Sequence, residues 1–110
     1  METIHKELAA GRWRNLSLCE QLANIGGEVS RARLWQKKDP AVFDRAVTRA
    51  LELFELTLSD SRWHGRWREI ARSREVFLDT VSDGTEYRDS LERLERYFND
   101  FALCARSTSL

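Results

Sequence analysis

The chain has 110 residues, of which 42% are apolar and four are tryptophan, and this composition indicates a chain with a folded core rather than a disordered one. Eighteen basic and eighteen acidic residues cancel, so no overall field attracts nucleic acid or an anionic membrane. We expect a single domain over residues 1–110, with its core at 15–106 and a disordered tail at 107–110.

We expect no signal peptide and no membrane-spanning segment in this sequence. Residues 1–11 lack the apolar run of a signal peptide, and no apolar stretch reaches the roughly 18 residues that a membrane span needs. Two cysteines without a secretory signal indicate reduced thiols in the cytoplasm. Basic residues outnumber acidic ones by 14 to 10 up to residue 74, and acidic residues outnumber basic ones by 8 to 4 beyond it. Such halves can pair within one bundle or between subunits.

The first long helix is the element around which we expect the fold to be organised. A short helix over residues 3–10 should end at Gly11, and Asn15 or Ser17 should cap a long helix that runs to about Lys37. The apolar stripe of that helix consists of Leu18, Leu22, Ile25, Val29 and Ala32. Alternating spacings of four and three residues predict that this stripe packs against other helices.

Small residues form a column beside the stripe: Cys19, Ala23, Gly26, Gly27 and Ser30. Two consecutive glycines cost about 1 kcal/mol each in a helix, so we expect the column to permit close approach of another helix backbone. A second stripe is polar and is either a solvated face or an interface; it contains Gln21, Asn24, Glu28 and Arg31.

Three further helices follow. Asp39 before Pro40 predicts the start of the second helix, which should end near Leu58. The third is expected from about 61 to 82, and the fourth from about 90 to 106 with Asp89 and Glu92 as a capping box. Connections of about two to seven residues predict an all-α fold: an antiparallel up-down-up-down four-helix bundle with a short N-terminal helical segment.

The two cysteines test this helix order. Cys19 lies near the start of the first long helix and Cys104 near the end of the fourth, so both should lie at the same end of the bundle. We expect their Cα atoms within about 15 Å, without a disulfide in a reducing compartment.

Motifs for catalysis, cofactors and metals are absent from the sequence. It has no glycine-rich phosphate loop, no nucleophile-elbow serine and no HExxH. His5 and His64 lack a cysteine or second histidine at ligand spacing. We assign no catalytic residue, no metal and no cofactor, and expect no enzymatic activity.

One cluster combines basic and aromatic residues: Arg62, Trp63, Arg66, Arg68, Arg72 and Arg74. Such arginines can clamp phosphates while a tryptophan stacks on bases. We favour the alternative, that Trp63 and Trp67 are core residues one turn apart and the arginines line a solvated side.

Arg74 lies where the third helix calls for an apolar side chain. Either it is buried and paired with Glu28 or Glu20, or its aliphatic stem covers the core while the guanidinium reaches water.

Several segments resemble a family of small uncharacterised helical proteins of bacteria and archaea, over about residues 12–106. They are NLSLCEQLANIGGEVSRARLW, RALELFELTLSD, REVFLD and YFNDFALCAR. The resemblance implies one compact domain and no known activity. The four-helix plan is more remotely similar to HEPN-type bundles, which accompany minimal nucleotidyltransferases or act as ribonucleases. The ribonuclease motif needs an arginine followed several residues later by histidine; no histidine follows Arg74, so this similarity implies no nuclease activity.

The sequence therefore predicts a non-catalytic helical-bundle protein that acts by self-association, as a dimer, or by binding a partner protein. Some of four aromatic residues are expected to stay partly uncovered and to favour association; the four are Trp35, Phe43, Phe54 and Phe101. The alternative is an accessory nucleic-acid or nucleotide-binding bundle that uses the cluster at 62–74.

Overall fold

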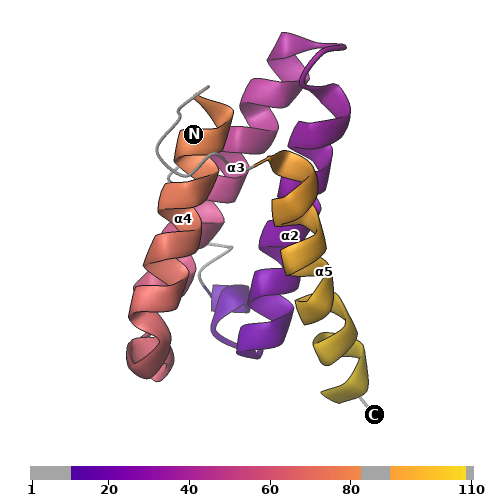
Figure 1. The fold of residues 1–110 in the computed structure, drawn as a ribbon. Helices are drawn as coiled ribbons and strands as arrows, with labels where there is room; N and C mark the ends of the chain where they lie inside the picture. Colours follow the sequence, from indigo (N-terminus) through magenta and orange to yellow (C-terminus); the bar gives the residue numbers. More distant parts are fainter. Residues whose placement is uncertain (1–10, 83–89, 109–110) are drawn as a thin grey trace.

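The chain is all-helical in the computed structural model, which describes residues 11–82 and 90–108 (Figure 1). No strand occurs within these residues. The Cα radius of gyration is 13.7 Å, close to the roughly 13 Å of a compact domain of this length. The predicted fold class is confirmed at this level.

Helix α2 (Leu18–Trp35) is the predicted first long helix. Ser17 caps it: the Ser17 hydroxyl accepts from the Glu20 amide at 3.1 Å, and the Glu20 carboxylate accepts from the Ser17 amide at 2.8 Å. This reciprocal pair satisfies two backbone donors at the helix start. Four stripe residues are buried, namely Leu22, Ile25, Val29 and Ala32.

Helix α3 (Pro40–Leu58) has the predicted bounds. The Asp39 side chain accepts from the amides of Ala41 and Val42 at 3.1 and 3.4 Å, and Pro40 needs no amide partner at the first helical position. Phe54 of this helix is fully buried against Phe77 and Phe98, so it is not among the aromatic residues that stay partly uncovered.

The predicted third helix is two elements: a 3₁₀ helix η1 (Ser61–Arg66) and helix α4 (Trp67–Val81). The chain leaves helical geometry at Trp63, where φ is −106° and ψ is 20°. This kink accompanies a hydrogen bond from the Trp63 indole to Gln21 of α2. A long-range contact therefore replaces the continuous helix that the local pattern predicts.

Helix α5 (Leu91–Thr108) extends past the predicted end at Arg106. Residues 107 and 108 therefore belong to a helix, while residues 109 and 110 of the expected tail lie outside the described residues. The Ser90 hydroxyl accepts from the Arg93 amide at 3.2 Å; the predicted cap, Asp89, lies outside the described residues.

The N-terminal segment also differs from expectation. Residues 11–13 are helical, so the predicted helix stop at Gly11 is wrong, while residues 3–10 lie outside the described part. The helical turn places Trp13 in a buried position, and that burial offsets the weak helix propensity of glycine. None of the helices in the described ranges has the length and apolarity that crossing a membrane requires.

Helix α2 packs most extensively, against α5 on one side and α3 on the other; α3 also packs on α4, whereas α4 and α5 touch less. In Figure 1, consecutive helices from α2 to α5 run in opposite directions across the view. The buried aromatic residues of the core come from three of these helices: Phe54, Phe77 and Phe98. α2 thus contacts the elements that carry most of the core.

Candidate functional site

Gly26 is a position where α5 lies directly against the backbone of α2. A Cβ atom added there would lie 2.6 Å from Cβ of Phe98, a separation that real side chains do not reach. Both residues are buried. The glycine thus lets the Phe98 side chain lie directly against the α2 backbone.

Gly27 has the opposite environment. It is exposed, and an added Cβ would meet nothing within 4 Å. A shallow depression of about 460 Å³ lies over it, lined also by Ala23, Asn24, Glu28 and Arg31. Only the first glycine of the pair serves the helix contact that the sequence predicts for both.

Two other members of the predicted contact set, Ser30 and Glu28, make polar contacts. The Ser30 hydroxyl bonds the Glu95 carboxylate of α5 and, together with Arg33, holds the pKa of Glu95 below its ordinary value. Glu28 pairs with Arg31 at 3.8 Å and with Arg49 of α3 at 3.6 Å. These contacts tie α2 to both of its main neighbours.

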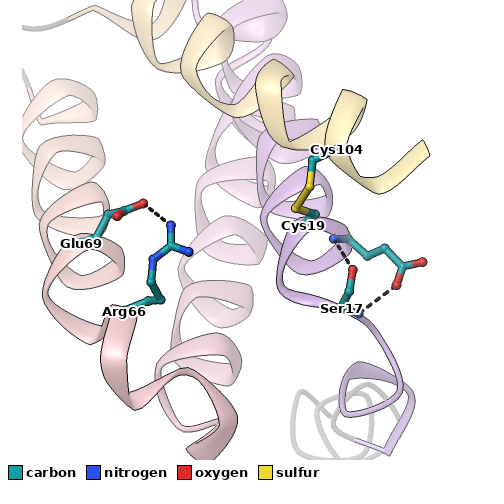
Figure 2. Close-up of a disulfide and its surroundings, with 6 residues drawn as sticks. Ser17, Cys19, Arg66, Glu69 and Cys104 are labelled. Carbon is teal, nitrogen blue, oxygen red and sulfur yellow. Dashed lines mark hydrogen bonds and ion pairs between the residues drawn. A yellow bond between two sulfur atoms is a disulfide. The ribbon is translucent and has the colours of Figure 1, made fainter. Parts of the chain in front are cut away.

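Cys19 and Cys104 form a disulfide (Figure 2), with their Cα atoms 5.8 Å apart. The prediction that they lie at one end of the domain is confirmed. The expectation of two unbonded thiols is wrong, because the two cysteines face each other across the antiparallel α2–α5 contact and satisfy the spacing that a disulfide requires.

A buried polar network lies near the same end of α2, around Gln21. The fully buried Gln21 amide donates to the Trp13 carbonyl at 2.8 Å and to the Asp60 carboxylate at 3.2 Å, and its oxygen accepts from Trp63 Nε1 at 3.0 Å. The Trp13 indole donates to the Thr57 hydroxyl at 3.0 Å. We call these five residues the Gln21 network.

Arg62 closes the network on its solvent side. Its guanidinium donates to Asp60 at 2.7 Å and to the Leu16 carbonyl at 3.0 Å, and it lies 4.4 Å from the Trp63 ring centroid. Hydrogen bonds from Arg62 lower the pKa of Asp60 from 3.8 to about 2. The segment before α2, the end of α3 and the start of η1 are thereby joined.

Sequence reasoning missed this network because it placed Gln21 on the polar stripe of the first helix. A signal was present, since Gln21 follows Leu18 by three positions and precedes Ile25 by four, which is the spacing of the apolar stripe. The polar stripe therefore divides: Gln21 is buried, whereas Asn24 and Arg31 are exposed.

The arginine cluster at 62–74 does not form a single basic surface. Arg62 pairs with Asp60, Arg66 with Glu69 at 2.9 Å (Figure 2), and Arg74 with Glu55 of α3 at 2.9 Å. Each of these carboxylates neutralises a charge that a phosphate would otherwise meet. The Arg74 partner is neither Glu28 nor Glu20, the two that the sequence suggests.

Trp63 of this cluster and Trp67, which lies between Arg66 and Arg68, differ in exposure. Trp63 is half-buried and packs against the core, as expected. Trp67 is 51% exposed, so its predicted place in the core is wrong. The change from η1 to α4 between them alters the helical phase, and Arg68 and Arg72 of α4 are exposed as well.

The connection between α2 and α3 forms a tip with uncovered apolar side chains. Leu34 is 48% and Trp35 39% exposed, while Phe43 at the start of α3 is half-buried. At about 1.5 Å per residue, the 19 residues of α3 make it about 6 Å longer than the 15-residue α4. Figure 1 shows the α2–α3 connection beyond the adjacent ends of α4 and α5.

Basic residues border the tip. Lys37 and Lys38 are exposed in the α2–α3 connection. Beside Leu34, the ends of α2 and α4 and the start of α5 line a depression of about 450 Å³. We define the α2–α3 tip by Leu34, Trp35, Lys37, Lys38 and Phe43.

No protein-family model, curated protein or solved structure matches the chain.

Residues 11–82 and 90–108 contain no group of three or more His, Cys, Asp or Glu side chains placed to hold a metal ion. The most strongly perturbed carboxyl group, Asp60, is engaged by Arg62 and Gln21 within the fold. The α2–α3 tip, in contrast, combines exposed apolar and cationic side chains.

Proposed function

We propose that the protein is a non-catalytic helical-bundle protein that acts by self-association, as a dimer, or by binding a partner protein through the α2–α3 tip. The observation that supports this function is the exposure of two adjacent apolar side chains, Leu34 and Trp35, at the end of α2. Covering apolar surface contributes about 25 cal/mol per Å². In a symmetric dimer the same tip would be covered on both copies.

The proposal includes the finer topology. We infer that α2, α3, α4 and α5 act as one antiparallel up-down-up-down bundle, in which the α2–α3 hairpin extends furthest. Short connections between successive helices support this arrangement. Membership of the small bacterial and archaeal family also stays a proposal.

Because of the charges at the tip, self-association and binding of an acidic partner should depend on salt in opposite ways. Two copies that meet through their tips bring four lysines together, so added salt should strengthen a dimer by screening their repulsion. A partner with acidic residues around an apolar centre should bind more weakly as salt is added.

A measurement of mass tests self-association. We expect a dimer by light scattering at about 100 µM, where a contact of modest affinity is populated. The double variant Leu34→Ala/Trp35→Ala should be monomeric, whereas the control Trp67→Ala, which removes a more exposed tryptophan elsewhere, should remain dimeric. A monomeric mass for the unaltered protein at that concentration would rule out the dimer.

One observation supports nucleic-acid binding as a second candidate: Trp67, Arg68 and Arg72 are all exposed on α4. We expect nucleic-acid binding to be weaker than association through the tip, because Asp60, Glu69 and Glu55 pair with three arginines of the cluster. A salt titration with single-stranded RNA and DNA decides the matter. Binding that falls steeply with salt and disappears in Trp67→Ala would favour this candidate over association.

A cytoplasmic location stays a prediction from the sequence. The Cys19–Cys104 disulfide counts against this prediction, since such bonds persist mainly in oxidising compartments.

A further inference from the structure

The Cys19–Cys104 disulfide is the last of three contacts along the line where α5 crosses α2. Glu95 pairs with Arg33 at 2.8 Å, Phe98 lies against Gly26, and Cys104 is bonded to Cys19. Residue numbers fall along α2 as they rise along α5, so the two helices are antiparallel. The disulfide therefore holds the far end of a contact whose other end has its own ion pair.

Beyond Phe98, the described side chains of α5 make few contacts with the rest of the fold. Phe98 is fully enclosed in the core, whereas Phe101 is half-buried and Leu103 is 57% exposed. Figure 1 shows α5 diverging from α4 toward its C-terminal end. Among the side chains described there, Phe101 and Cys104 are the ones that attach this part to the rest of the fold.

Both cysteines are half-buried, so a thiol reductant can reach the bond. Cys19 is the second residue of α2, where the positive end of the helix dipole stabilises negative charge. Cys19 is therefore the better leaving group, and the sulfur of Cys104 is the one that a thiolate attacks.

We propose that Cys19–Cys104 is a reversible redox latch, which holds residues 99–108 of α5 on α2 when oxidised and releases them when reduced by a dithiol. A reductant thiolate forms a bond to the Cys104 sulfur and breaks the Cys104–Cys19 bond, and Cys19 leaves as a thiolate that takes up a proton. The second thiol of the reductant then displaces Cys104. The reductant ends as a disulfide, having passed two electrons to the cysteine pair.

Hydrogen exchange of the full chain tests the latch. The protein is equilibrated with oxidised glutathione, or with dithiothreitol, and amide exchange is followed by mass spectrometry. We expect reduction to accelerate exchange in residues 99–108 by more than about tenfold, while residues 22–32 and 91–98 change less than about twofold. Equal protection of 99–108 in both states, or loss of protection throughout the chain, would overturn the proposal.

Two controls distinguish the latch from effects of the reagents. The double variant Cys19→Ser/Cys104→Ser should show the fast exchange of residues 99–108 in both buffers. Thiol counting should give no free cysteine after oxidation and two after reduction. If the thiols remain free in oxidised glutathione, the disulfide does not form in solution and the latch is wrong.

Discussion

The two ends of α2 differ in how their side chains are satisfied. At the start, Ser17 caps the helix, Cys19 is cross-linked and the Gln21 amide has three hydrogen-bond partners. At the finish, Leu34 and Trp35 are exposed. The first end joins distant parts of the chain, and the second leaves surface free for another molecule.

The contrast has an energetic basis. A buried amide costs several kcal/mol unless it is hydrogen-bonded, so the Gln21 network stabilises the one arrangement in which its bonds are all made. Apolar side chains at the tip lose nothing by remaining in water, and gain only when an interface covers them. The start of α2 therefore specifies the fold, while the finish of α2 is available for association.

The largest effect on stability should come from Gln21→Leu, which breaks the Gln21 network at the start of α2. The Trp63 indole and the Trp13 carbonyl each lose a partner in a buried or half-buried position. At about 1–3 kcal/mol for each unsatisfied group, we expect a destabilisation of about 3 kcal/mol. Urea unfolding followed by tryptophan fluorescence measures it directly.

Asn24→Leu is the matched control, one turn further along α2. The exposed Asn24 side chain donates only to the Glu20 carbonyl, so the change should stay within about 0.5 kcal/mol. If the two variants unfold at the same urea concentration, the Gln21 network does not stabilise the fold.

Local signals in the sequence predict the helices well but not their contacts. The Asp39–Pro40 pair fixes the start of α3, and Ser17 with Glu20 fixes the start of α2, because each cap acts within three or four residues. Gln21 contacts Trp63 and Asp60 from 42 and 39 positions away, and no periodicity records such partners.

The same limit applies to the candidate site. The uncovered Trp35 and the partly covered Phe43 are predictable from the apolar pattern, whereas the burial of Phe54 depends on the packing of α4 and α5 around it. The disulfide depends on two facing positions 85 residues apart. The sequence places both cysteines at one end, but an assumed reducing compartment led to the wrong bonding state.

A second prediction separates the two adjacent glycines of α2. Gly26→Leu should destabilise by about 2 kcal/mol or more, because its side chain must displace Phe98 from the α2 surface. Gly27→Ala should stabilise by up to about 1 kcal/mol, since the position is open and alanine favours the helix. Thermal unfolding of both variants checks the signs; destabilisation by Gly27→Ala would place that residue in a contact.

A third prediction uses pH to weaken the Gln21 network at the start of α2. The pKa of Asp60 is about 2 in the folded protein against an ordinary 3.8, so the unfolded chain takes up the proton first as pH falls. The contribution is complete above about pH 4 and is lost as the pH falls toward 2. We expect ionised Asp60 to contribute about 1 kcal/mol to the free energy of unfolding, because solvent around the partly exposed Arg62 reduces the effect.

Asp60→Asn isolates this contribution. The lowered pKa of Glu95 acts with the same sign in both proteins, so it cancels in the difference between them. Urea unfolding should show the variant less stable at pH 5, with the gap narrowing toward pH 2. A gap that does not depend on pH would mean that ionisation of Asp60 is not coupled to folding.

The smallest effect on stability should come from Trp35→Ala at the finish of α2. This variant tests whether the exposed side chains there serve association rather than stability. The Trp35 side chain is 39% exposed on the last turn of α2, and a surface substitution there should change the unfolding free energy by no more than about 0.5 kcal/mol at dilute, monomeric concentration. The same change should weaken self-association by about tenfold or more, because an aromatic anchor in an interface contributes at least about 1.4 kcal/mol. Sedimentation equilibrium and urea unfolding of one preparation supply both numbers. A large loss of stability with unchanged association would assign Trp35 to the fold and remove the distinction between the two ends of α2.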